Sequence, residues 1–177
     1  MFPFLQILLE DLGFDERFIS PLRERYLVPI CSTLFPDYGG CHLDSHKAFI
    51  VSYRVGAGVD LDCHYDNAEV TLNISLNDSY EEGTLYFGQM RGTPTMDYTH
   101  VPASPCPGYG LLHRGQQMHG ALPIVDGERH NFIIWMRSSI ERNRLCPMCN
   151  QKPVLVETDG NGDGFSPPAD VNVCTVN

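Results

Sequence analysis

The chain has 177 residues, of which 42% are hydrophobic and 19% charged, and its formal net charge is −10 at pH 7. This length fits one domain with a sizeable core, and the composition is ordinary for a globular protein. There is no basic run that could follow a phosphate backbone, which disfavours nucleic-acid binding, and no apolar run near the roughly 18 residues of a membrane span.

The cysteines and the first residues of the chain indicate the cellular compartment in which we expect the protein. Seven cysteines are an odd number, spread along the chain. The opening residues MFPFLQILLE contain neither a basic leader nor a small-residue cleavage site, so we expect no signal peptide. We therefore expect free thiols in a reducing compartment, and an intracellular protein of the cytoplasm or nucleus.

The first predicted element is an amphipathic helix over residues 20–35. Ser20 is a suitable N-cap and Pro21 a suitable first helical residue, and apolar residues follow near helical spacing. Pro29 predicts a kink or an early end of this helix. The sequence FPDYGG that follows predicts a turn, so residues 1–46 are expected to form a helical support.

From residue 47 onward the pattern changes to short strands separated by Gly, Pro and Asp. Strands are predicted over residues 48–54, 61–66, 69–76, 83–88, 108–115, 116–122 and 129–138. Regularly spaced short strands are typical of a sandwich or barrel. The last strand is largely apolar on both faces, so both should be covered, as in a sheet with helices outside and a cavity inside.

Residues 69–76 alternate strictly between polar and apolar. The polar row consists of Glu69, Thr71, Asn73 and Ser75, and the apolar row of Val70, Leu72, Ile74 and Leu76. One arrangement lines a barrel interior with the polar row and packs the apolar row outward on helices. The other puts the polar row in water and the apolar row in the core.

His64 and Asp66 stand just before this strand. Alone, an H-x-D triplet is weak evidence and is equally expected in a surface turn. His119 ends a later strand-like run, Arg129 heads a strand, and Tyr53 lies on the strand before His64. Two imidazoles and one carboxylate can bind one face of an Fe(II) ion, which leaves coordination positions open for a bidentate 2-oxo acid and dioxygen. An arginine fork suits the distal carboxylate of such a cosubstrate.

These motifs resemble the Fe(II)/2-oxoglutarate-dependent dioxygenases, in the prolyl and lysyl hydroxylase branch. The similarity runs through CHLDSHKAFIV, CHYDNAEVTLN, GTLYFG, LHRG followed by HGA, and RNRLCPMC. The resemblance implies a mainly β fold, a double-stranded β-helix (a jelly-roll, cupin-like barrel) over residues 47–139, with the N-terminal helix packed outside. Residues 140–177 are expected to form an irregular tail rich in Cys, Gly and Pro.

The resemblance also implies roles at the site. His64, Asp66 and His119 would be the iron ligands, and Arg129 and Tyr53 would bind the far carboxylate of 2-oxoglutarate, with L-ascorbate keeping the iron reduced. Trp135 matches a family tryptophan near the site, and we interpret it first as a packing residue. The family resemblance also favours the arrangement in which the polar row of residues 69–76 lies inside the barrel.

A hydroxylase is thus the leading interpretation of the function. The family's domain carries more chain before its first core strand than residues 1–46, which favours the alternative, a non-catalytic β-helix binding or scaffold module. The intact set of ligands favours the enzyme. Proline, lysine and small molecules all stay open as substrates.

Two further motifs compete for metals. CPMC (Cys146 to Cys149) has the spacing of half a structural zinc site, with Cys174 as a third ligand, and its alternative is a pair of thiols in a turn. DGNGDGFSPPAD, residues 159–170, partly fits a calcium loop, but an Asp/Gly-rich turn is the better interpretation. Cys63 is expected in the core. The remaining histidines are expected to be ordinary surface or core residues: His42, His46, His100, His113 and His130.

Overall fold

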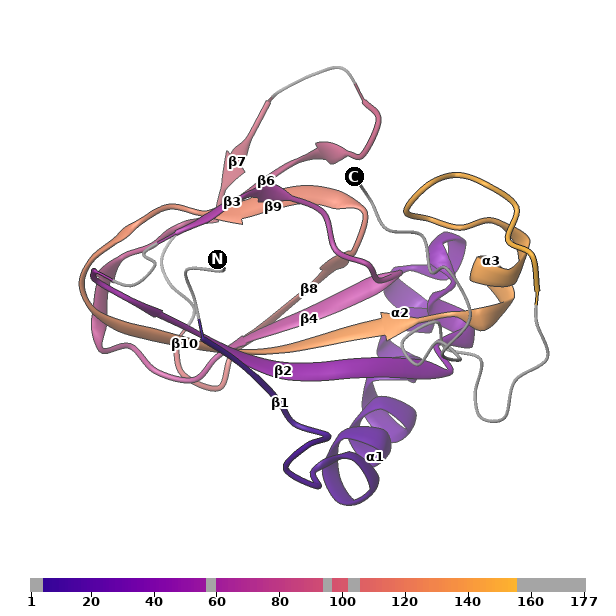
Figure 1. Cartoon of the computed structure of the whole chain (residues 1–177), viewed down its shortest axis with the longest axis horizontal. Helices are drawn as coiled ribbons and strands as arrows, with labels where there is room; N and C mark the ends of the chain where they lie inside the picture. The colour runs from indigo at the N-terminus through magenta and orange to yellow at the C-terminus, as the bar shows by residue number, and fades with distance from the viewer. Residues whose placement is uncertain (1–4, 57–59, 94–96, 102–105, 156–177) are drawn as a thin grey trace.

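The computed structural model describes residues 5–56, 60–93, 97–101 and 106–155 (Figure 1). The strands are β1 (Leu5–Leu8), β2 (Ser45–Arg54), β3 (Leu61–His64), β4 (Val70–Ser75), β5 (Tyr80–Glu82), β6 (Leu85–Met90), β7 (Thr99–His100), β8 (Gly110–Arg114), β9 (Gln117–Ala121) and β10 (Ile124–Arg137). The helical elements are η1 (Asp15–Ile19), α1 (Ser20–Leu22), η2 (Arg23–Leu27), α2 (Val28–Leu34), η3 (Pro36–Tyr38), η4 (Gly40–His42) and α3 (Ser139–Arg144).

The strands form two antiparallel sheets that face each other, as the double-stranded β-helix prediction requires. The large sheet has the order β1-β2-β10-β4-β8, and β5 also pairs with β10. The small sheet has the order β3-β9-β6-β7. Figure 1 shows the small sheet lying over the large one, so that each contributes one face to the space between them. Within the described residues the two sheets are separate hydrogen-bonded units rather than one continuous barrel.

The two faces of the large sheet differ as the alternation of residues 69–76 predicted. Val70 and Leu72 belong to the outer core, which the N-terminal helices cover. Thr71 and Asn73 point the other way and line a cavity between the sheets. Leu76 does not pack outward on the helices as the prediction required, since it lies beyond β4 and is 43% exposed. The interior placement of the polar row is therefore confirmed at its centre.

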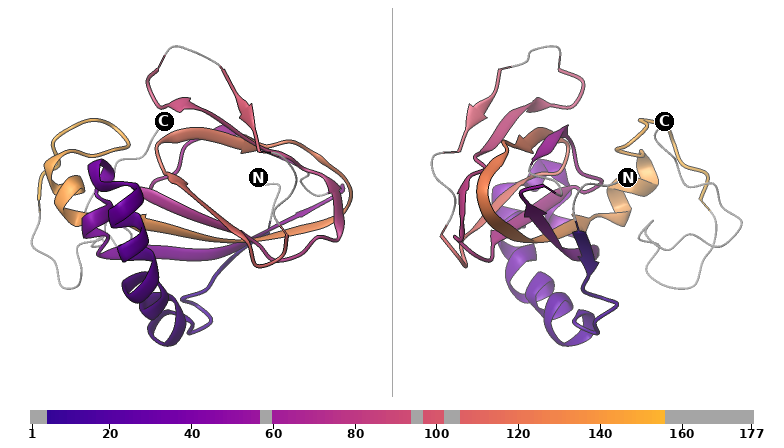
Figure 2. Two further views of the ribbon diagram at one scale, coloured as in Figure 1. Left: turned by 180° about the vertical axis from the view of Figure 1, so that it is seen from behind. Right: turned by 60° about the vertical axis from the view of Figure 1, so that its left-hand side comes forward.

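The N-terminal helical segment packs across the outer face of the large sheet, on the side away from the small sheet (Figure 2). The buried side chains Ile19, Leu27 and Cys31 meet the outward side chains of β2, β4 and β10. The early end expected at Pro29 is wrong, because the chain stays helical from Asp15 to Leu34. Two π-helical turns, η1 and η2, precede the prolines, which lack the N–H that a regular helix would use. No helix among the described residues is long and apolar enough to span a membrane.

Several sequence-based predictions need correction. The N-terminal support is not only helical, because β1 pairs with β2 at the edge of the large sheet. The short strands β5 and β7 were missed, and β10 begins at Ile124 rather than at residue 129. The tail is not irregular throughout, since α3 forms its first residues and is capped by Ser138. Cys63 is half-buried rather than in the core, with its Sγ 3.6 Å from the hydroxyl of Tyr98. Residues 159–170 and Cys174 lie outside the described residues.

Candidate metal centre

The fold brings His64, Asp66 and His119 together at the inner face of the small sheet. His64 and His119 are cross-strand partners on β3 and β9, and their ring centroids are 4.3 Å apart. Asp66 lies in the loop after β3, with its two oxygens each 3.5 Å from one of the imidazole Nε2 atoms. One donor atom from each residue lies within 4.8 Å of the others. This spacing lets one ion contact all three donors.

The backbone sets the orientation of both imidazoles. Nδ1 of His64 lies 2.7 Å from the carbonyl of Asp62, and Nδ1 of His119 lies 2.8 Å from the carbonyl of Gln117. A carbonyl can only accept, so each Nδ1 carries the hydrogen and donates it. In the neutral form of each imidazole, Nε2 therefore keeps a free lone pair toward the centre, which is the tautomer that metal ligands need.

Asp66 is held from several sides. Its side-chain Oδ2 accepts a hydrogen bond of 2.6 Å from the hydroxyl of Thr71, on the inner face of β4. Its backbone N–H donates to the carbonyl of Gly115 at 2.7 Å. A side chain at Gly115 would place Cβ 2.1 Å from the carbonyl oxygen of Ala68, so only glycine permits this close approach. The carboxylate is consequently fixed before any ligand binds.

The protonation states also suit metal binding. Burial alone would raise the pKa of Asp66, but the interactions of its carboxylate with the imidazoles of His64 and His119 outweigh burial and lower it. Burial lowers the pKa of His119 to about 4. For His64, burial opposes protonation, while Asp66 and the carbonyl of Asp62 raise the pKa overall. Near neutral pH, Asp66 is ionised and His119 is neutral, the forms in which these side chains bind metals.

Arg129 lies on β10 in the same cavity, opposite Tyr53 on β2. It is only 3% exposed. Its Nε donates to Asn131 at 2.7 Å and its Nη1 to the carbonyl of Gly83 at 2.9 Å. No Asp or Glu of the described residues forms an ion pair with it, so the guanidinium is a buried cation held only by neutral groups.

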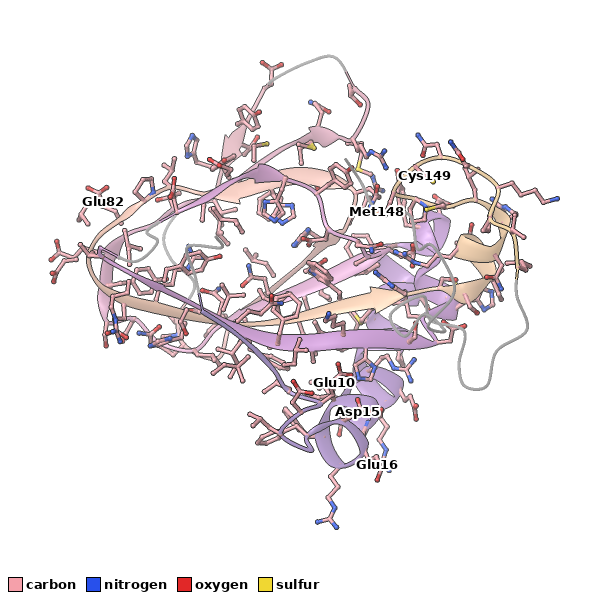
Figure 3. All side chains as sticks on the ribbon, viewed as in Figure 1. Glu10, Asp15, Glu16, Glu82, Met148 and Cys149 are labelled. Carbon is pink, nitrogen blue, oxygen red and sulfur yellow. The ribbon has the colours of Figure 1, made fainter. Side chains whose placement is uncertain are left out.

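The cavity between the sheets joins these two regions. Its volume is about 540 Å³, and it is lined by Arg129, by Tyr53 and by the three residues His64, Asp66 and His119, which we call the triad. Figure 3 shows side chains from both sheets projecting into this space. Trp135 lines the cavity and also packs edge-on against Phe49, with ring centroids 5.0 Å apart, so the packing interpretation holds and the residue also borders the site. Burial raises the pKa of Tyr53 to about 12, so its phenol stays protonated near neutral pH.

The position of His113 beside the triad was not predicted from the sequence. This residue is on β8, opposite Thr71 on β4, and only 6% exposed. Its Nε2 is 4.0 Å from Oδ2 of Asp66 and has no hydrogen-bond partner in the described part of the chain. The inward position in the strand 108–115 was the signal that could have found it. The other histidines are ordinary, as predicted: His46 bonds Asp15 at 2.6 Å, and His130 contacts Ser52 and Glu128.

Two facing antiparallel sheets with a His-Asp-His cluster between them define the class of the Fe(II)/2-oxoglutarate oxygenase fold. A solved structure of prolyl 4-hydroxylases from Phytophthora capsici superposes with a TM-score of 0.56 at 18% identity, over 79% of this chain and 51% of that one. At this identity the likeness concerns the fold. No family model matches the chain.

Curated proteins narrow the comparison. The chain is 51% identical over 175 residues to 2-oxoglutarate and iron-dependent oxygenase domain-containing protein 2 of Xenopus tropicalis, covering 96% of this chain and 50% of that protein. Its identity to the protein of the same name from Danio rerio is 54% over 164 residues, covering 93% and 48%. The chain thus spans about half the length of these relatives. The resemblance to the Fe(II)/2-oxoglutarate oxygenases that the sequence predicted is confirmed.

Proposed function

We propose that this chain is an Fe(II)- and 2-oxoglutarate-dependent dioxygenase that hydroxylates a C–H bond of a peptidyl or small-molecule substrate. The overall reaction converts 2-oxoglutarate, dioxygen and the substrate into succinate, CO2 and the hydroxylated product. One observation carries the proposal: the metal-binding triad His64, Asp66 and His119 lines the same cavity as Arg129, a buried arginine that pairs with no carboxylate of the described residues.

The donor set fits Fe(II). Two neutral imidazoles and one carboxylate are the ligands that non-haem Fe(II) oxygenases use, and they leave coordination positions open. His64, Asp66 and His119 would hold the ion, which when bound supplies the activation of dioxygen. The chain's own contribution is to keep both Nε2 lone pairs and the Asp66 carboxylate aimed at one point without rearrangement.

Arg129 and Tyr53 would bind the far carboxylate of 2-oxoglutarate. Among the described residues, the buried guanidinium of Arg129 is bonded to neutral groups only. A bound anion would therefore stabilise its buried charge. The protonated phenol of Tyr53 can donate to the same carboxylate. Arg129 thus orients the cosubstrate with its keto-acid end toward the triad. L-ascorbate as a reductant of the iron rests on the family resemblance.

A non-catalytic binding module is the alternative. It is less well supported, since a scaffold has no need of a triad with both imidazole tautomers fixed by the backbone. Succinate formation from 2-oxoglutarate, measured with Fe(II) and without added substrate, separates the two. The enzyme produces succinate slowly, and production stops in an Asp66→Ala variant. Binding of Fe(II) and 2-oxoglutarate without any succinate would favour the scaffold.

A further inference from the structure

The turn after α3 contains the cysteine pair Cys146 and Cys149 and has a defined shape. The N–H of Cys146 donates to the carbonyl of Gln151 at 2.9 Å, and the N–H of Asn150 donates to the carbonyl of Cys146 at 2.8 Å. Asn150 has φ 57°, in the left-handed region that Asn and Gly tolerate best. These bonds close residues 146–151 into a compact loop, named here the CPMC turn.

The CPMC turn rests on two side chains from other parts of the chain. Nη1 of Arg91, the residue after β6, donates to the carbonyl of Pro147 and lies 3.5 Å from Oε1 of Gln116. Nε2 of Gln116 lies 3.9 Å from Sδ of Met148. Figure 3 shows Met148 and Cys149 on the side of the molecule where the chain passes from β3 to β4. The turn is therefore docked close to the loop that carries the triad carboxylate.

The same two side chains hold that loop. Nε2 of Gln116 donates to the backbone carbonyl of Asp66 at 2.7 Å. Together with the bond from the N–H of Asp66 to Gly115, this fixes both backbone polar groups of Asp66 to residues 115–116. The guanidinium of Arg91 lies 4.6 Å from the ring centroid of Tyr65, the residue between His64 and Asp66. A chain of contacts thus runs from the CPMC turn through Arg91 and Gln116 to the triad.

We propose that Gln116 and Arg91 are positioning residues of the metal centre, and that the CPMC turn holds them in place. This inference rests on the proposed function, because it assumes that the triad binds a divalent metal. Outer partners of metal ligands fix the ligand orientation, and their loss typically weakens metal binding about 10–100-fold. Residues 139–155 after β10 are then part of the centre, although they contribute no ligand to it.

The first test measures the affinity of the full chain for Mn(II), by EPR titration without 2-oxoglutarate. Gln116→Leu and Arg91→Met should each bind Mn(II) about 10–100-fold more weakly than wild type. Arg91→Lys should recover part of the loss, because it keeps a cation that can lie over Tyr65. Gln89→Leu and Arg25→Met make the same changes at exposed positions and should bind like wild type. Thermal unfolding followed by circular dichroism checks that every variant is folded.

The second test changes only the turn. Asn150→Val places a β-branched residue at positive φ and should distort the turn, whereas Asn150→Gly accepts that conformation freely. Mn(II) affinity should fall in the valine variant and be kept in the glycine variant. Equal Mn(II) affinities in wild type, Gln116→Leu, Arg91→Met and Asn150→Val would overturn this inference but not the proposed function. A wild-type chain that binds no Mn(II) would instead overturn the proposed function.

Discussion

Replacing Arg129 with alanine is the sharpest test of the cosubstrate assignment. The side chain is 3% exposed and has no carboxylate partner within the described residues, so a bound 2-oxoglutarate carboxylate would be its sole charged contact. Removing one partner of a buried charge pair costs roughly 2–5 kcal/mol, much of it from the charge left behind. Since each 1.4 kcal/mol is a factor of ten, the dissociation constant of 2-oxoglutarate should rise about 30-fold or more.

Stability has to be separated from affinity in this experiment. Arg129→Ala also removes the donors that Asn131 and the carbonyl of Gly83 now accept from. Leaving a buried acceptor without a donor costs about 1–3 kcal/mol, although water entering the cavity can replace the lost donors. The folded fraction of each variant should therefore be measured first. Mn(II) affinity is expected to change little, because Arg129 is not a ligand.

The assay is calorimetric titration of 2-oxoglutarate into the Mn(II)-loaded chain. Arg129→Lys should recover part of the affinity, since lysine keeps the charge but not the planar fork. Arg54→Ala is the matched control: Arg54 lies next to Tyr53 on β2, but its side chain is 66% exposed and pairs with Glu128. Wild-type affinity in a folded Arg129→Ala variant would refute the cosubstrate assignment and leave the triad to another metal chemistry.

Three other predictions concern the metals and the thiols. His64→Ala or His119→Ala should abolish the weak visible charge-transfer band of the anaerobic Fe(II)/2-oxoglutarate complex, and a band kept by both variants would show that the ligand assignment is wrong. The zinc interpretation of the CPMC turn predicts about one zinc per chain in elemental analysis, lost in Cys146→Ser, whereas a zinc-free chain of unchanged stability supports the pair of thiols. Cys31 is fully buried, which raises the pKa of its thiol to about 11, so mass mapping after alkylation at pH 8 should find it unmodified while the exposed Cys41 is labelled. Rapid labelling of Cys31 in the folded chain would contradict its burial.

The sequence predicted those parts of the fold that a repeating pattern encodes. Alternation of period two identified β4, and a largely apolar run identified β10. The alternation alone left open which face of β4 points inward, and the family resemblance favoured the inward position of Thr71 and Asn73 that the structure shows. The edge strands β1, β5 and β7 have only four, three and two residues, too few for any alternation to be distinguished from chance. The π-helical turns before the prolines could not be predicted either, because the spacing of apolar residues does not distinguish π-helical from α-helical hydrogen bonding.

At the site, residue types were easier to predict than their surroundings. His64, Asp66, His119 and Arg129 were predicted from their residue types together with the family resemblance, and the structure places all four around one cavity. His113 was set aside: its position in the strand could indicate an inward side chain, but nothing in the sequence indicates that Asp66 would lie 4.0 Å from it.

The surroundings of the triad depend on contacts between residues that are distant in the sequence. Gln116 reaches the backbone of Asp66 only because the turn between β8 and β9 folds against the loop after β3, fifty positions earlier in the chain. Thr71 reaches the carboxylate of the same residue from another strand. Both donors hold Asp66 in place without binding the metal themselves. A chain that kept only the three ligands would therefore keep the motif but lose the rigidity that lets the motif bind a metal strongly.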